Sequence, residues 1–270
     1  MVDKFLEGKG AVITGGASGF GRGVAYAFAE RGADLVLVDL NEELLEETAK
    51  KVVEKTGQKV IPIVCDVVDS KAVKKMADRA FNELDNVYIL FNNAGTALAY
   101  GLDVIRIGEK AWDRTINVNL KGQWLVDKFL CRQMNRQDFK PLRGKVIHTS
   151  SVYGISLSPF VPAYSISKAG VIALNKLLAK TLAPHISSNA ITPGYHVTGI
   201  YGNREDIMLQ SMEDGHVKTP LNRIGTVEDV VNLLLFLASS KSDFITGHCF
   251  TIDGGIADVG VPPYDLDVEI

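Results

Sequence analysis

Short apolar runs alternate with longer amphipathic segments along most of the chain. The apolar runs are rich in β-branched residues and predict strands at 11–14, 35–39, 60–64, 87–91, 145–149, 188–192 and 248–252. The segments between them have helical periodicity at 19–31, 42–56, 70–84, 110–135, 162–183 and 226–240. Strands that alternate with helices predict βαβ units. We therefore expect an α/β fold, a doubly wound parallel sheet of about seven strands with helices on both faces, which explains why the strands are nearly all apolar.

Two segments interrupt this alternation. Residues 194–225 mix polar and aromatic positions around a short helical pattern near 203–213, and residues 256–270 form a tail that ends acidic. Because ligands bind beyond the carboxyl ends of the strands in such sheets, the first segment is a candidate substrate lid. The alternative is a surface excursion without a role. We expect residues 1–270 to form a single domain, since about 200–250 residues is routine for one α/β domain.

Composition narrows the possible partners. The chain has 270 residues, 46% of them hydrophobic, and a net charge of −3, which argues against nucleic acid and against an anionic membrane surface. No run approaches the roughly 18 apolar residues of a membrane span. Three widely spaced cysteines indicate a reducing compartment, so we expect a cytoplasmic protein. The five histidines lack the spacing of a zinc site, and no metal is expected.

A glycine-rich turn follows the first predicted strand and opens a helix. Glycines at 15, 16, 19 and 21 let the backbone approach a pyrophosphate, and the helix N-terminus offers unpaired N–H groups. The turn alone could be structural, but its place between a strand and a helix at the start of a βαβ unit favours a dinucleotide site. The predicted ligands here are Gly15, Ser18, Gly19, Phe20 and Gly21.

Asp39 closes the second strand near the roughly 20-residue offset at which an acid binds the cofactor ribose. A carboxylate accepts from both ribose hydroxyls of NAD and repels the 2′-phosphate of NADP. Leu40, which we also predict to bind the cofactor, and Ser18 do not supply the cation that a 2′-phosphate needs. The sequence therefore predicts NAD as the cofactor, although Asp39 could instead be an acid at a helix N-terminus.

Further motifs occur in a fixed order along the chain. After the glycine-rich turn come Cys65-Asp66-Val67, Asn92-Asn93-Ala94-Gly95, Asn117-Val118-Asn119, Ser150-Ser151, Tyr164-Ser165-Ile166-Ser167-Lys168, Pro193-Gly194 with Val197-Thr198, and Asp253-Gly254-Gly255. In these motifs the chain resembles the short-chain dehydrogenase/reductase family over nearly its whole length. It departs from that family at Ile186-Ser187-Ser188, where a glycine and a basic residue are usual.

The resemblance implies a Rossmann-like fold and an NAD-dependent oxidoreductase that interconverts a secondary alcohol and a ketone. It adds to the predicted cofactor ligands the residues Asp66, Val67, Asn92, Asn93, Ala94, Gly95, Tyr164, Lys168, Pro193, Gly194, Val197 and Thr198. It also implies a homotetramer, in which the helices predicted at 110–135 and 162–183 pair between subunits. Alternatively, the apolar faces of these helices only pack on the sheet.

Four residues form the predicted catalytic set, namely Asn119, Ser151, Tyr164 and Lys168. Tyr164 and Lys168 are four residues apart and share one helix face. An adjacent ammonium lowers the tyrosine pKa from about 10, so Tyr164 can act as general acid and base. The resemblance implies that Ser151 holds the substrate oxygen, that Lys168 also holds the nicotinamide ribose, and that Asn119 uses its carbonyl to position a water that reaches Lys168. Each motif alone could be an ordinary helix pair, cap or solvated residue.

The substrate is less well defined. The predicted pocket holds Ser151, Tyr153, Tyr164, Tyr195 and His196, a mixture of aromatic surface and hydrogen-bonding groups. This mixture suits a small cyclic or polyhydroxylated alcohol or ketone. Two other functions stay open: a non-catalytic NAD-binding sensor or scaffold, and a family member that performs epimerisation or dehydration.

Overall fold

A parallel sheet forms the centre of the computed structural model, which describes residues 3–98, 101–196, 198, 209, 212–213, 215 and 218–259. In this part of the chain seven strands lie in the order β3-β2-β1-β4-β5-β6-β7, and every pair is parallel. The strands are β1 Gly10–Thr14, β2 Asp34–Asp39, β3 Val60–Val64, β4 Ile89–Asn92, β5 Gly144–Thr149, β6 Ile186–Pro193 and β7 Cys249–Ile252. The predicted doubly wound α/β fold is confirmed.

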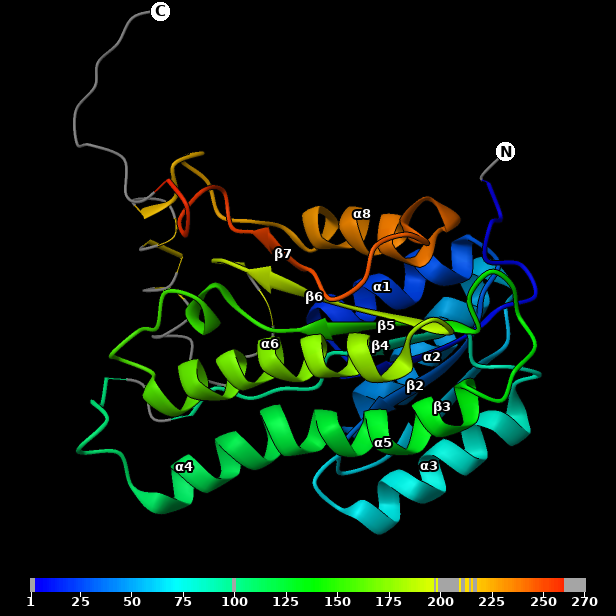
Figure 1. Ribbon diagram of the computed structural model, residues 1–270, viewed down its shortest axis with the longest axis horizontal. Coiled ribbons are helices and arrows are strands. Elements are labelled where there is room, and N and C mark those ends of the chain that lie inside the picture. Colours follow the sequence, from blue (N-terminus) through cyan, green and yellow to red (C-terminus); the bar gives the residue numbers. More distant parts are fainter. Residues whose placement is uncertain are drawn as a thin grey trace, which may run out of the picture.

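Helices cover the sheet in two layers (Figure 1). One layer holds α1 Gly19–Glu30, α2 Glu42–Thr56 and α8 Val227–Ala238. The other holds α3 Ser70–Glu83, α4 Glu109–Ile116, α5 Gln123–Met134 and α6 Pro162–Leu182. Both faces of the inner strands are therefore removed from water, which is why they read as apolar runs rather than alternating ones.

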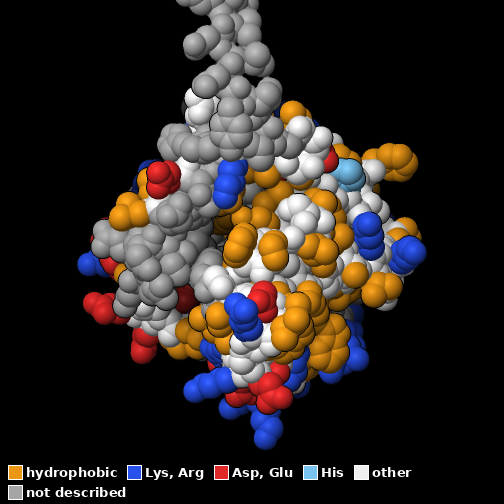
Figure 2. Space-filling view, turned by 90° about the vertical axis from the view of Figure 1, so that its left-hand side faces the viewer, with side chains coloured by type: hydrophobic (Ala, Val, Ile, Leu, Met, Phe, Trp, Pro, Cys, Tyr) orange, Lys and Arg blue, Asp and Glu red, His pale blue; other side chains and the backbone are white. Residues whose placement is uncertain are grey.

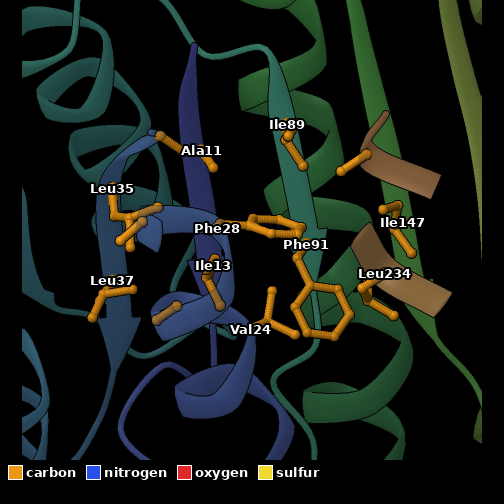
Figure 3. Packing of buried hydrophobic residues seen from close by; sticks show 14 of the residues in the cluster. Ala11, Ile13, Val24, Phe28, Leu35, Leu37, Ile89, Phe91, Ile147 and Leu234 are labelled. Atoms are coloured by element: carbon orange, nitrogen blue, oxygen red, sulfur yellow. The ribbon is translucent and has the colours of Figure 1, made fainter. Parts of the chain in front are cut away.

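The core on the α1 side shows how these layers are held together. Phe28 of α1 and Leu234 of α8 are fully buried and pack on Ile13, Phe91 and Ile147 of the central strands (Figure 3). Burying side chains of this size stabilises the fold by roughly 1.5–3 kcal/mol each. This core fixes the positions of β1, β4 and β5 relative to one another, and the loops that leave these strands carry the site.

The winding of the chain reverses beside β1. From β1 the chain moves outward through β2 to β3, and then returns to place β4 on the other side of β1. The loops that follow the carboxyl ends of β1 and β4 therefore turn to opposite sides of the sheet. Between them they form a crevice of the kind in which open α/β sheets bind ligands. Figure 2 looks at this end of the sheet and shows hydrophobic side chains gathered there. The exposed apolar residues in the loops after β4 and β5 include Leu102, Ile105, Ile155, Leu157 and Phe160.

One predicted helix is interrupted. The segment predicted at 110–135 consists of α4 and α5 joined by a six-residue π-helical turn, Asn117–Gly122. Tertiary contacts account for the wider turn, because the Asn119 side chain bonds to the backbone of Thr96 and a Cβ on Gly122 would lie 2.8 Å from Val67 Cγ2. Such turns often mark functional sites.

Other boundaries shift by a few residues. The sixth strand begins at Ile186, in the segment that departs from the family pattern, and extends to Pro193. Half of the predicted lid at 194–225, including most of the helical pattern near 203–213, lies outside the described residues, and the predicted tail at 256–270 is described only as far as residue 259. Within the described ranges, no helix is both long enough and apolar enough to cross a membrane.

Candidate active site

The turn between β1 and α1 forms a cradle of backbone. Gly15 and Gly19 have positive φ angles of 69° and 50°, which favour glycine. A Cβ on Gly21 would lie 1.9 Å from the carbonyl oxygen of Gly15, so the helix can start this close to the turn only with glycine. Ser18 is the N-cap but makes no side-chain cap hydrogen bond, and half-buried Phe20 follows Gly19 in the first turn. The first N–H groups of α1 therefore suit a pyrophosphate.

Two acids lie at or just after the ends of β2 and β3. Asp39 Oδ2 accepts from Ala17 N at 3.1 Å, and Oδ1 accepts from Leu40 N at 2.7 Å and from Asn41 N. The carboxylate thus ties the end of β2 to the turn after β1. Asp66, after β3, accepts from Val68 N at 3.1 Å and pairs with Arg114 of α4 at 3.5 Å.

The turn after β4 is held by the end of β1. The Thr14 hydroxyl accepts from Asn93 N at 2.8 Å and from Ala94 N at 3.0 Å. The side chain of Asn93 donates to Thr14 O and accepts from the hydroxyl of Thr149 on β5. The predicted cofactor residues Asn92 to Gly95 therefore lie beside the cradle, at the point where the winding reverses.

Lys168 is buried beneath this turn. Its ammonium donates to Thr149 O at 2.8 Å and lies 5.5 Å from the centre of the Tyr164 ring. A Cβ on Gly95 would be 3.4 Å from Lys168 Nζ, so glycine keeps the space above the ammonium open. Burial lowers the pKa of Lys168 from its ordinary value to about 7. The prediction that Tyr164 and Lys168 share one face of α6 is confirmed.

Ser151 begins a short 3₁₀ turn, Val152–Gly154, that packs on α6. Its hydroxyl accepts from Tyr153 N at 3.1 Å and is buried. The neighbouring Ser150 hydroxyl donates to Lys168 O at 2.7 Å, and a Cβ on Gly154 would lie 2.8 Å from the carbonyl carbon of Lys168. These contacts hold the loop that carries Ser151 against the part of α6 that carries Tyr164 and Lys168.

Asn119 is fully buried on the π-helical turn. Its Oδ1 accepts from Thr96 N at 2.8 Å, and its Nδ2 donates to Thr96 O and to the Ser167 hydroxyl. The side-chain amide therefore clamps the loop after β4 to α6.

The predicted substrate residues separate into two groups. Tyr153 and Tyr195 join through their hydroxyl oxygens at 2.8 Å, with their rings edge to face. His196 is buried against Phe20 of the cradle, with ring centres 5.3 Å apart, and its Nδ1 contacts Gly194 O at 3.1 Å. Burial lowers the pKa of His196. Its ring thus lies on the cofactor side of the site.

The remaining predicted cofactor residues follow β6. Gly194 N donates to Ile252 O at 3.0 Å, and a Cβ on Gly194 would lie 2.6 Å from Asp253 Cβ, so the turn after Pro193 requires glycine. Thr198 is described and half-buried, whereas Val197 lies outside the described residues.

Comparisons with known proteins identify the family of the chain. A family profile described as "Enoyl-(Acyl carrier protein) reductase" matches residues 15–257. The chain belongs to the short-chain dehydrogenase/reductase family. It is 36% identical to 3-oxoacyl-acyl-carrier-protein reductase FabG of Thermotoga maritima over 93% of this chain and 98% of that protein. It is 34% identical to 2-dehydro-3-deoxy-D-gluconate 5-dehydrogenase of Dickeya dadantii, over 93% and 96%. The crystal structure of NAD+-bound xylitol dehydrogenase superposes with a TM-score of 0.83 at 30% identity, over 93% and 99%.

Membership of this family implies a nicotinamide cofactor, and the residues present fit one. The backbone cradle would hold the pyrophosphate, and Asp39 stands where a ribose would reach the end of β2. Gly95 leaves space beside Lys168 for the nicotinamide ribose. When bound, the nicotinamide accepts or returns the hydride in this family's oxidation and reduction.

Sequence reasoning missed the residues that support this site. Thr149 accepts from Lys168, Thr96 holds Asn119, and Ser150 bonds the backbone of Lys168. Their partners are far away in the sequence, so only the assembled fold reveals them. The sequence carries only a weak signal for such supporting residues, namely a polar residue at the carboxyl end of an otherwise apolar strand.

The depressed pKa of Lys168 predicts a pH dependence of stability. Folded Lys168 releases its proton near pH 7, whereas an unfolded lysine keeps it to about 10.5. Between these values the unfolded chain binds more protons, so stability rises with pH. Relative to Lys168→Met, the free energy of unfolding of the wild type should rise between pH 7 and 10 by up to about 1.4 kcal/mol per pH unit. Denaturant unfolding of the cofactor-free proteins measures this, with exposed Lys176→Met as control. A pH-independent difference between wild type and Lys168→Met would contradict it.

Proposed function

We propose that the protein is an NAD(H)-dependent oxidoreductase that interconverts a secondary alcohol and a ketone. The observation that carries this proposal is the buried Lys168 ammonium, placed against the Tyr164 ring and below the cofactor turn. A lysine buried this deeply costs stability, and in this place it has a chemical use. Function is argued here from the site and not from the fold alone.

The residues divide the chemistry among them. The positive charge of Lys168 favours the phenolate of Tyr164, which takes the proton from the substrate hydroxyl as hydride leaves carbon. In reduction the phenol returns that proton to the oxygen. Ser151 holds the substrate oxygen and stabilises its developing charge. Asn119 serves as a relay, with its main-chain carbonyl positioning a water that reaches Lys168.

Asp39 supports NAD over NADP. Its carboxylate is fixed at the end of β2 by three backbone N–H groups, so it cannot swing away from a 2′-phosphate without losing them. Leu40 is half exposed beside it and brings no positive charge. Two like charges at about 4 Å repel by roughly 1–4 kcal/mol near a protein surface.

For the substrate we propose a small cyclic or polyhydroxylated alcohol or its ketone. Tyr153 lies two residues after Ser151 and Tyr195 directly follows Gly194, so their bonded hydroxyls place polar groups where a substrate hydroxyl could meet them. Two relatives are named for sugar-related compounds, 2-dehydro-3-deoxy-D-gluconate and galactose. His196 would contribute from the cofactor side, and residues 194–225 would close over the substrate as a lid.

The non-catalytic sensor is the competing proposal. It predicts cofactor binding without turnover and does not need a general base. The arrangement of Tyr164, Lys168 and Ser151 favours the enzyme, because a sensor would not need a buried ammonium beneath a tyrosine.

The enzyme proposal predicts turnover that depends on Tyr164. With NAD+ or NADH, absorbance at 340 nm should change with secondary alcohols, polyols or cyclic ketones. Tyr164→Phe should lower kcat by about 10²–10⁴-fold because it removes the proton acceptor, while the Kd for NADH stays the same. Tyr26→Phe, on the outer layer, is the control. Persistent turnover by Tyr164→Phe would refute the mechanism, and turnover of only long-chain acyl or steroid compounds would refute the substrate class. Binding of NADH without turnover of any compound would favour the sensor.

The cofactor proposal predicts a kcat/KM for NAD+ above that for NADP+. Asp39→Asn keeps the shape of the side chain but removes its charge, so the ratio should fall about tenfold or more. Asp34→Asn, at the opposite end of β2, should leave the ratio unchanged. A wild-type ratio below one would overturn the preference for NAD.

We also propose a cytoplasmic homotetramer. On α6, Val171 faces the core, but Leu177 and Ile166 are exposed, as is Trp124 on α5. Pairing these helices between subunits would bury that apolar surface. Light scattering should therefore give about four times the chain mass, and Leu177→Glu should lower it. A wild-type mass equal to one chain would exclude the tetramer.

A further inference from the structure

A row of polar side chains crosses three strands beneath the site. Thr14, Asn92 and His148 occupy neighbouring positions on β1, β4 and β5, and His148 is the register partner of Asn92. Two residues earlier on the same face, the corresponding row is apolar and consists of Val12, Leu90 and Val146. All six side chains are buried, so the upper row places polar groups where the lower row has only hydrocarbon.

Asp127 of α5 faces the middle of this row. Its Oδ1 accepts from Asn92 Nδ2 at 2.9 Å, and His148 Nε2 lies 3.1 and 3.0 Å from its two oxygens. Asp127 and His148 are at most 1% exposed. A carboxylate this deep is costly unless its hydrogen bonds have a fixed geometry, and it is absent from the catalytic set.

The hydrogen bonds all run in one direction. Asn92 Nδ2 donates to Asp127 and to Gln123 O at 2.9 Å, so its Oδ1 must face the Thr14 hydroxyl, which donates to it at 3.3 Å. With its proton directed there, the Thr14 oxygen is left to accept from the N–H groups of Asn93 and Ala94. Each bond polarises the next, and the carboxylate is the acceptor that ends the chain.

We propose that Asp127, assisted by His148, is a positioning residue for cofactor binding, acting on the turn at 93–95 through Asn92 and Thr14. This inference rests on the proposed NAD(H)-dependent function. Without an acceptor at Asp127, the orientation of the Asn92 amide depends on the Gln123 carbonyl alone. The Thr14 hydroxyl is then free to rotate, and the turn loses the oxygen that fixes its two N–H groups.

His148 completes the acceptor site. Because carboxylate oxygens accept, Nε2 is the donor of the imidazole, and its Nδ1 has no hydrogen-bond partner among the described residues. The charged and titratable groups that meet at this point are Asp127 from α5, His148 from β5 and the buried Cys131 thiol one turn further along α5, with neutral Asn92, Gln123 and Thr14 around them. His148 also precedes Thr149, whose carbonyl accepts from Lys168, so the pair lies beneath both the cofactor turn and the catalytic lysine.

The test is the Kd for NADH, measured by fluorescence titration well below each protein's Tm. Asp127→Asn should raise Kd at least tenfold, because its amide can donate toward Asn92, while kcat at saturating cofactor falls less. Leu130→Ala, buried one turn further along α5, is the matched control: it should lower Tm but leave Kd unchanged. An Asp127→Asn variant that lowers Tm without changing Kd would show a purely structural role and overturn the proposal.

A double-mutant cycle tests the route. If Asp127 acts through Thr14, Asp127→Asn combined with Thr14→Ala should bind NADH no more weakly than Thr14→Ala alone, whereas independent effects would multiply and refute the route. If Asp127→Asn does not fold, His148→Gln should still raise Kd at least twofold, and an unchanged value refutes the proposal. Failure of the wild type to bind NADH would instead refute the proposed function, and this inference with it.

Discussion

The hydroxyl of Thr14 joins two loops that meet only because the chain reverses its winding beside β1. It accepts from the backbone of Asn93 and Ala94, which follow β4, and it immediately precedes the glycine-rich turn that follows β1. Parallel strands place their carboxyl ends at one edge, but the loops at a reversal diverge, and something must fix the distance between them. The buried hydroxyl oxygen of Thr14, which has two acceptor positions, fixes that distance here. The glycine-rich turn after β1 and the turn after β4 both depend on it.

Lys168 illustrates the cost of such a site. Its ammonium is buried and donates to the backbone carbonyl of Thr149, and burial lowers its pKa to about 7. Contacts from four separate elements hold the lysine in this unfavourable, buried position. Thr149 comes from β5, Gly95 from the loop after β4, Ser150 and Gly154 from the loop after β5, and Asn119 reaches α6 through Ser167. Glycine at 154 allows a close approach that a Cβ would prevent, because that atom would lie 2.8 Å from the Lys168 carbonyl carbon, and glycine at 95 leaves the space beside Lys168 Nζ open.

The sequence was sufficient to predict the sheet, because buried parallel strands leave a simple apolar pattern and the order of motifs is specific. It also placed Tyr164 and Lys168 on one helix face, since a spacing of four needs no tertiary information. It did not predict the π-helical turn at Asn119, because that turn depends on Thr96 and Ser167, which are distant in the chain. The sequence also grouped His196 with the two tyrosines, whereas its ring packs on Phe20, a contact that no local pattern encodes.

The polar row under the site could not be predicted from the sequence. Thr14, Asn92 and His148 each end or nearly end a strand, where a polar residue is ordinary, and Asp127 looks like a solvated helix position. Only the register of β4 with β5 and the position of α5 show that all four meet in a dry interior. A neutral acceptor could satisfy the same donors, but an amide in that place could equally turn and donate. An ionised carboxylate cannot donate, so it leaves the amide of Asn92 and the hydroxyl of Thr14 a single orientation. In our proposal, Asp127 therefore sets the direction of hydrogen bonding at the turn after β4 without touching the cofactor.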